Sequence, residues 1–85
     1  ITTNWVKDIN MKFGIDTMPT TPIEWESNII FGAKNGNVYL IDKNNKYKSL
    51  LFLGNARVHS VQQIGYNQFL ASNMDGEIVV FKLYN

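Results

Sequence analysis

Two glycine-centred turn signals recur 40 residues apart in this chain of 85 residues. The segment Lys34-Asn35-Gly36-Asn37-Val38 aligns with Met74-Asp75-Gly76-Glu77-Ile78. Three further pairs of segments share the offset and match in apolar or glycine character: Phe13-Gly14 with Leu53-Gly54, Ile29-Ile30 with Phe69-Leu70, and Leu40-Ile41 with Val80-Phe81. Because a fixed period indicates copies of one supersecondary unit, we expect two repeats, at residues 5–44 and 45–84.

Each repeat carries a strand, a turn and a second strand. Asn35-Gly36 separates residues 28–33 from 38–41, and Asp75-Gly76 separates 69–71 from 78–81. Asn-Gly or Asp-Gly between two such apolar runs is a strong hairpin signal, because a type I′ turn needs positive φ at both central residues. We therefore expect positive φ at Gly36 and Gly76, at equivalent tips that join residues 29–34 to 37–42 and 69–74 to 77–82.

The predicted fold class is all-β, with about four strands in each repeat. Residues 5–13 and 47–53 precede the turn glycines Gly14 and Gly54, and residues 21–25 and 59–64 precede the hairpins. Helix is disfavoured, since two prolines interrupt the only long alternative segment and no stretch of a dozen residues keeps a 3.6-residue period. Eight strands of this length also suffice for a small closed barrel or sandwich, which stays open as the alternative fold.

Three of the expected strands are apolar without alternation, at residues 29–31, 50–53 and 78–81. Such runs are typical of strands that are covered on both faces. Sheets stacked between neighbours have that environment, whereas a hairpin with one wet face does not. Two stacked units would leave two outer faces uncovered. We therefore expect the chain alone to associate or to be partly unfolded, with its outer strands packed against other protein.

The strand motifs resemble a known class of repeat. Gly36-Asn37-Val38-Tyr39-Leu40-Ile41-Asp42 resembles the strand core of quinoprotein-like (PQQ-type) β-propeller repeats, and Thr20-Thr21-Pro22-Ile23 resembles the segment that precedes it there. Trp5 falls near the tryptophan that closes a preceding repeat. The second copy is similar to a WD40 blade in four segments: His59-Ser60-Val61, Leu70-Ala71-Ser72, Asp75-Gly76 and Ile78-Val79-Val80-Phe81. It lacks the WD40 Gly-His and Trp-Asp dipeptides, and has Val79 and Lys82 in place of the PQQ-type Tyr and Asp.

This resemblance implies four-stranded antiparallel propeller blades, about two repeats of a larger ring. Rings have about 4–8 blades, so the remaining blades are expected from the same protein or from other chains. Because the chain opens with Ile1 and not Met, we expect a segment of a longer chain. The implied function is a protein-binding or scaffolding module. The alternative is that these are non-catalytic blades of a larger propeller enzyme, a quinoprotein-like dehydrogenase or a hydrolase, whose active residues lie elsewhere.

Composition excludes several other functions. Eight basic and seven acidic residues give a net charge of +1, without the basic patch that nucleic acid selects. No apolar run approaches the roughly 20 residues that span a bilayer. The absence of cysteine excludes disulfides, thiolate zinc sites and a cysteine nucleophile. Asp42, Asp75 and Glu77 lack the spacing of a calcium loop, so no metal or cofactor site is predicted.

No catalytic residue is predicted either. His59 is the only histidine, and its neighbour Ser60 points to the opposite face if both lie on a strand. Glu24 and Glu26 share a face but have no site around them, so a solvated rim is the favoured interpretation. Three residues are candidates for contact with a protein partner, although packing is the favoured role of the first: Trp25, Arg57 and His59.

Overall fold

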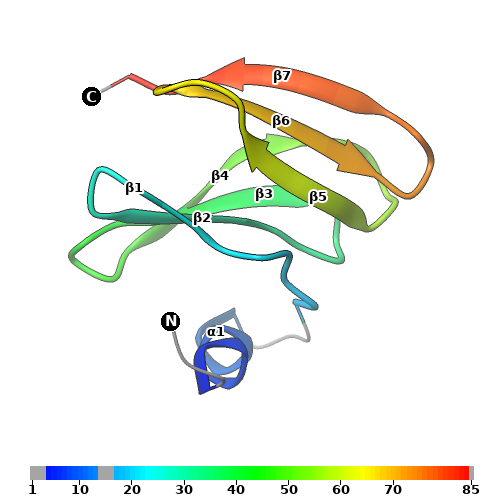
Figure 1. Cartoon of the computed structure of the whole chain (residues 1–85). Coiled ribbons are helices and arrows are strands. Elements are labelled where there is room, and N and C mark those ends of the chain that lie inside the picture. Colours follow the sequence, from blue (N-terminus) through cyan, green and yellow to red (C-terminus); the bar gives the residue numbers. More distant parts are fainter. Residues whose placement is uncertain (1–3, 14–16, 85) are drawn as a thin grey trace.

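The structure is a computed structural model that describes residues 4–13 and 17–84 (Figure 1). It is all-β with one helix, α1 (Asn4–Phe13). Seven strands follow: β1 (Ile23–Trp25), β2 (Asn28–Gly32), β3 (Asn37–Ile41), β4 (Tyr47–Phe52), β5 (Val58–Gln63), β6 (Gln68–Asn73) and β7 (Ile78–Lys82). They form two antiparallel sheets in chain order, β1-β2-β3-β4 and β5-β6-β7. The described strands therefore form neither a closed ring nor a closed barrel.

Figure 1 shows three layers, with α1 on one side of the first sheet and the second sheet on the other. The core between the two sheets is built around Ile30 and Val38 from the first sheet and Phe69 and Ala71 from the second. A smaller core between α1 and the first sheet consists of Ile9, Phe31, Ala33, Tyr39 and Ile41. The first sheet is therefore covered on both faces.

The two glycine hairpins form in the same register, as the repeat predicts. Ile30 pairs with Leu40 in the first sheet, and the residues 40 positions further on, Leu70 and Val80, pair in the second. Gly36 has a φ of 90° and Gly76 a φ of 83°. The expectation of positive φ at both hairpin tips is confirmed.

The type of these two turns differs from the prediction. Neither Asn35 nor Asp75 is among the described residues with positive φ, so the turns are not type I′. The Gly36 amide donates to the Ala33 carbonyl, and the Ala33 amide donates to the Asn37 carbonyl. This pattern closes a three-residue loop, which is a type I turn followed by a glycine bulge. The β6–β7 loop has the same bonds 40 residues further on.

A type I′ geometry occurs instead between β1 and β2. Glu26 and Ser27 have φ values of 51° and 64°, and the flanking residues Trp25 and Asn28 pair with each other. Sequence did not indicate this turn, because it contains neither glycine nor asparagine. Left-handed backbone at a non-glycine residue costs about 1–2 kcal/mol, and the hairpin must offset that cost through its strand pairing and the burial of Trp25.

The predicted strand at residues 5–13 is wrong, because these residues lie in α1. Ile9 and Phe13 are four residues apart, so they share one helix face, and both pack on the first sheet. A helix of ten residues is shorter than the dozen that the sequence argument required. Trp5 lies in this helix rather than in a strand. Gly14 falls outside the described residues. The strands predicted at 47–53 and 59–64 are confirmed to within a residue. The first of them pairs with β3 in the first sheet and not with the second repeat, so the described sheets have four and three strands instead of four each.

The connection between the sheets, residues 53–57, is held by both hairpin tips. From the first tip, the Gly36 carbonyl accepts the Leu53 amide at 2.8 Å. From the second tip, the Met74 amide donates to the Arg57 carbonyl at 2.9 Å, and the Asn73 side chain donates to the Leu53 carbonyl at 3.2 Å. Both turn glycines thus lie at the end of the molecule where the chain crosses from one sheet to the other.

Asn73 is expected to contribute more to stability than the exposed Asn35 of the first hairpin. It is 4% exposed, it donates to Leu53 and Glu77, and its Oδ1 accepts the amides of Asp75 and Glu77. Because Asn73→Ala leaves buried groups without partners, we expect it to lower the free energy of unfolding by about 2 kcal/mol. Asn35→Ala, the control, should lose less than about 1 kcal/mol. Urea unfolding followed by tryptophan fluorescence measures both, and equal losses would contradict the assignment.

Candidate functional site

The repeat register divides each sheet into two equivalent faces. We call forward the face formed by Ile30, Val38 and Leu40 in the first sheet and by Leu70, Ile78 and Val80 in the second. We call rear the opposite face, formed by Ile29, Phe31, Tyr39 and Ile41 in the first sheet and by Phe69, Ala71, Val79 and Phe81 in the second. The rear face of the second sheet packs on the forward face of the first. The forward faces of the two sheets therefore point in the same direction.

The rear face of the first sheet is covered by α1. Ile9 is 4% exposed and packs with Phe31 and Tyr39. The Phe13 ring centroid lies 5.9 Å from that of Phe31, in an edge-to-face arrangement, and 4.7 Å from that of Tyr39. Sequence predicted two uncovered outer faces. That expectation is corrected, since α1 closes one of them.

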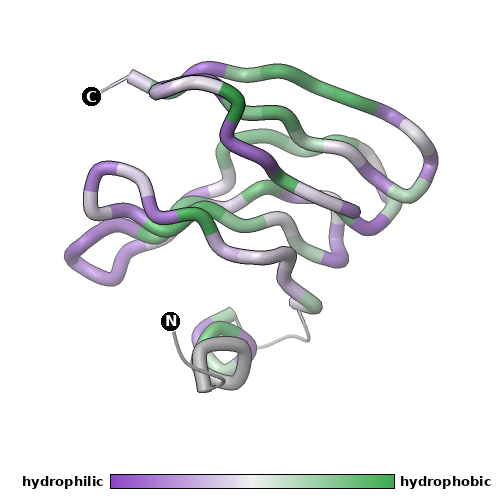
Figure 2. The backbone as a smooth tube through the Cα atoms, viewed as in Figure 1, coloured by the Kyte–Doolittle hydropathy of each residue, from purple (hydrophilic) through white to green (hydrophobic). Residues whose placement is uncertain are grey.

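The forward face of the second sheet is open. Ile78 is 65% exposed and Val80 is 58% exposed, whereas their equivalents Val38 and Leu40 are 0% and 8% exposed. The apolar run at 78–81 is therefore not covered on both faces by the described residues, and this is one of the two uncovered outer faces that the sequence predicted. Figure 2 shows this run as an apolar stretch of β7 at the outer edge of the molecule. An exposed cluster of large aliphatic residues is typical of a surface that binds protein.

Strand β7 also has a free edge. The second sheet is ordered β5-β6-β7, so one side of β7 has no strand partner among the described residues. In the first sheet, β4 pairs with β3 at the equivalent position. A strand edge with unpaired amides and carbonyls is a template for pairing with another chain. The open edge and the open forward face thus coincide on one strand.

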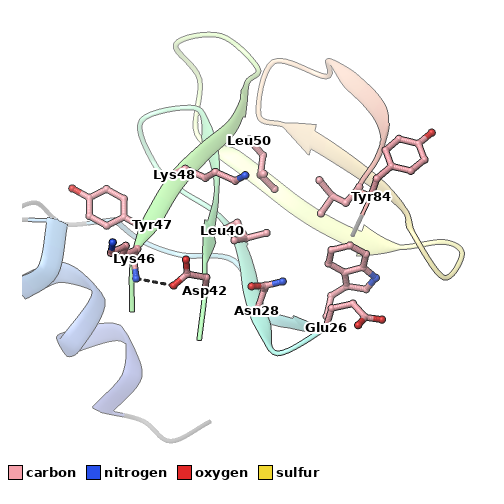
Figure 3. Close-up of a pocket in the computed structure, with 11 residues that line it drawn as sticks. Glu26, Asn28, Leu40, Asp42, Lys46, Tyr47, Lys48, Leu50 and Tyr84 are labelled. Atoms are coloured by element: carbon pink, nitrogen blue, oxygen red, sulfur yellow. Dashed lines mark hydrogen bonds between the residues drawn. The ribbon is translucent and has the colours of Figure 1, made fainter. Parts of the chain in front are cut away.

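A shallow cleft of about 600 Å³ lies where the two sheets diverge (Figure 3). Leu40 and Leu50 contribute apolar side chains, while Lys46 and Lys48 approach from β4 and the turn before it. Asp42 does not face the cleft as a free carboxylate, because its Oδ1 accepts the backbone amides of Asn44 and Lys46. The lining contains no histidine, serine or cysteine.

Trp25 has the packing role that sequence favoured. It is 7% exposed and belongs to the core between the sheets, where its ring lies edge-to-face with Phe69 at 5.9 Å. Its indole N–H donates to the Tyr66 carbonyl at 2.7 Å. It also contributes to the wall of the cleft. A direct contact between Trp25 and a protein partner stays a prediction.

Arg57 and His59 are both exposed, at the start of β5. The register of β5 with β6 shifts between Val58 and Ser60, which places His59 at a bulge. The hydroxyl of the neighbouring Ser60 lies 2.9 Å from that of Ser72. The structure therefore leaves both basic side chains exposed, and their contact with a protein partner stays a prediction.

The described residues show neither a candidate metal cluster nor a helix that could span a membrane. Within residues 4–13 and 17–84, no group of three or more His, Asp or Glu side chains is placed to hold a metal ion. The one helix of that region is too short and too polar to cross a membrane. The exposed forward face of the second sheet is a candidate binding surface.

Comparison of the chain with protein-family models, with curated proteins and with solved structures found no match.

Proposed function

We propose that the chain is a pair of β-propeller-type blades that serves as a protein-binding or scaffolding segment, and that the forward face of its second sheet binds a further β-sheet. The same-direction stacking of the two sheets carries this proposal. When a sheet packs with its rear face on the forward face of the preceding sheet, its own forward face points outward and can bind a further sheet. Interfaces of this head-to-tail kind close only when a ring is complete.

The stacking favours blades over a self-contained sandwich. In a sandwich, the inner faces of both sheets meet and polar residues cover the outside. Here the outward face of the second sheet carries Leu70, Ile78 and Val80, equivalent to residues that are buried in the first sheet. The resemblance to PQQ-type and WD40-like repeats supports the same assignment. Tyr39 and Asp42, the PQQ-type positions, bond to Asn35 and to the following turn, so they have structural roles here.

The partner is a β-sheet with large apolar side chains on its rear face. Phe69 and Phe81 fill this role inside the chain, where their rings stack at 5.4 Å against the first sheet's apolar face. A further blade of the same protein or of another chain supplies equivalent side chains. The free edge of β7 accepts a strand of that partner, as β3 accepts β4.

Extending the repeat tests this function. Asn85 lies 40 residues after Asn45, so a copy of residues 46–84 appended to the C-terminus continues the period. We expect the added unit to raise the free energy of unfolding of the existing sheets by about 2 kcal/mol or more, because burying an aliphatic side chain contributes about 1.5–3 kcal/mol. Urea unfolding gives the free energy, and hydrogen exchange of the β7 amides reports the new coverage.

The control for this extension is the same fusion with Val80→Lys in the original second sheet. The charge lies on the open face, where Val80 is 58% exposed, so it should not disturb the two existing sheets but should prevent docking of the third. The proposal fails if the added unit unfolds in a separate transition and the β7 amides exchange as fast as in the original chain. It also fails if the fusions with and without Val80→Lys have the same free energy of unfolding.

A further inference from the structure

Four of the described strands lie at sheet edges, and three of these carry features that hinder pairing with another chain. Strand β1 is only three residues long. Strands β4 and β5 each contain one extra residue, Leu50 and His59, where the register with the neighbouring strand shifts. Short edge strands and bulges are two means by which proteins block edge-to-edge pairing. These three edges are therefore poor templates for an added strand.

Strand β7 is the remaining edge strand, and it has neither feature. It pairs with β6 residue for residue from Ile78 to Lys82, without a register shift. Four of its five residues are apolar, and its one charged residue, Lys82, is the last. Figure 1 shows β7 along the outer edge of the second sheet. A regular apolar edge of this kind is a template for a strand from another chain.

The first sheet has a fourth strand at the equivalent place. The offset of 40 relates Val38 and Leu40 of β3 to Ile78 and Val80 of β7, and β4 pairs antiparallel with β3. The counterpart of β4 falls after residue 85. The position beside β7 is therefore defined by the repeat, but no described strand fills it.

The cleft between the sheets lies where an added strand would direct its rear side chains. Side chains alternate along a strand, so Leu83 follows Phe81 on the rear face of the second sheet. Leu83 lines the cleft together with Lys48 and Leu50 of β4 (Figure 3). Because the second sheet stacks with its rear face on the first, a strand beside β7 passes over β4. An aliphatic side chain on its rear face would thus contact Leu50 and Leu83.

The charges around the cleft favour an acidic residue near β4. Lys46 and Lys48 lie on that side, while Glu26 lies on the far side, in the turn after β1 (Figure 3). The Asp42 carboxylate is engaged near Lys46, because its Oδ1 accepts the amides of Asn44 and Lys46. A carboxylate on the added strand would therefore meet the Lys48 ammonium group, and complementary charges of this kind select partners.

We propose that the β7 edge and the cleft together bind an extended segment of a partner protein. The segment pairs antiparallel with β7 and directs one aliphatic and one acidic side chain into the cleft. Backbone hydrogen bonds provide the affinity, and the two side chains provide the selectivity. This proposal rests on the protein-binding function proposed above and names a second contact for it, which leaves the forward face of the second sheet open to a further sheet.

A synthetic peptide tests the site. In acetyl-Ser-Thr-Glu-Val-Leu-Val-Thr-Gly-amide, the Glu and Leu side chains lie on one face of the extended strand. We expect fluorescence polarisation of the labelled peptide to show saturable binding to the native chain, and hydrogen exchange to slow at the β7 amides but not at β4 or β5. A control peptide with Pro-Pro in place of Val-Thr keeps Glu and Leu but lacks donors for the strand edge, so it should bind at least about tenfold more weakly.

Reversal of one charge tests the cleft. Lys48→Glu should weaken binding of this peptide at least about fivefold, because it replaces attraction by repulsion. Lys43→Glu is the matched control, since Lys43 is also exposed but does not line the cleft, and it should stay within about twofold of the native chain. A peptide with Lys in place of Glu should prefer the Lys48→Glu variant to the native chain. Circular dichroism checks that both variants keep their strands.

Several results would overturn the strand site. These are no binding to the folded native chain, protection of β4 or β5 in place of β7, and equal losses in the two lysine variants. Protection of β7 that grows with protein concentration in the absence of peptide would assign the edge to a second copy instead. If the peptide fails while the repeat extension succeeds, the strand site alone is removed and the stacking function stands.

Discussion

Gly36→Ala is expected to lower the free energy of unfolding by about 3 kcal/mol or more, and Gly76→Ala by only about 1–2 kcal/mol. Both glycines have left-handed backbone, with φ values of 90° and 83°, so alanine carries a similar conformational strain at each. Their surroundings differ. A Cβ on Gly36 would lie 1.8 Å from the Gly54 carbonyl oxygen, whereas a Cβ on Gly76 would have no heavy atom within 4 Å.

The difference between the two variants therefore measures the contact between the first hairpin tip and residues 53–57. Backbone cannot rotate away as a side chain does, so Gly36→Ala must also displace the Leu53 amide that bonds to the Gly36 carbonyl. Urea unfolding of both variants, followed by the fluorescence of the buried Trp25, provides the comparison. Equal losses of stability in the two variants would mean that the first hairpin tip does not pack tightly against residues 53–57.

Local chemistry was sufficient to predict the two hairpins from sequence. Asn35-Gly36 and Asp75-Gly76 carry their turn signal within two residues, and the β-branched runs beside them favour strands. The offset of 40 also predicted their common register, which the pairs Ile30–Leu40 and Leu70–Val80 confirm. The turn type was wrong, because glycine supports positive φ in a type I turn with a bulge as well as in type I′.

Features that depend on contacts between residues distant in the chain could not be predicted from the sequence. Helix α1 has only about three turns, and its stability comes from Phe13 and Ile9 on the first sheet rather than from a long period. The Glu26-Ser27 turn has no glycine to mark it. Likewise, no local sequence pattern predicts that the Asn73 side chain donates a hydrogen bond to the carbonyl of Leu53, 20 residues away.

The candidate binding surface could be predicted in part, because two stacked units were expected to leave outer faces uncovered. Residues 78–81 lack alternation, which predicts coverage on both faces, and within the described residues the face with Ile78 and Val80 stays uncovered. The same pattern at Phe31 and Tyr39 is satisfied, because α1 covers them. Identical periodicity thus has two outcomes, depending on whether the chain supplies a covering layer.

Gly32→Ala is the second substitution for which we expect a large loss of stability, about 3 kcal/mol. Gly32 ends β2 at the junction of the two sheets. An added Cβ would lie 2.2 Å from Val58 Cγ1 and 2.7 Å from Val58 Cβ. Val58 is fully buried, and its amide bonds to the Ala33 carbonyl at 3.1 Å. The first residue of β5 therefore has little freedom to retreat, and the sheets must separate locally.

A double-mutant cycle with Val58→Ala isolates this contact. Val58→Ala alone should cost about 1–2 kcal/mol through the cavity that it leaves. In the double variant, the alanine methyl at position 32 occupies part of that cavity, so the two losses should not add. We expect a favourable coupling of about 1–2 kcal/mol between the sites. The rescue is only partial, because Val58→Ala keeps the Cβ of residue 58 at 2.7 Å from the added Cβ, and Thr20 Cγ2 lies at 3.3 Å.

Gly65→Ala is the control for replacing a glycine by alanine where the added methyl group meets no rigid neighbour. The nearest atom to its added Cβ is Gln68 Oε1 at 3.2 Å, the end of a flexible side chain, so the expected change is within about 0.5 kcal/mol. Urea unfolding of the wild type and these variants completes the set. Additive losses at Gly32 and Val58 would show that the close approach of β2 to β5 does not determine how the second sheet stacks on the first.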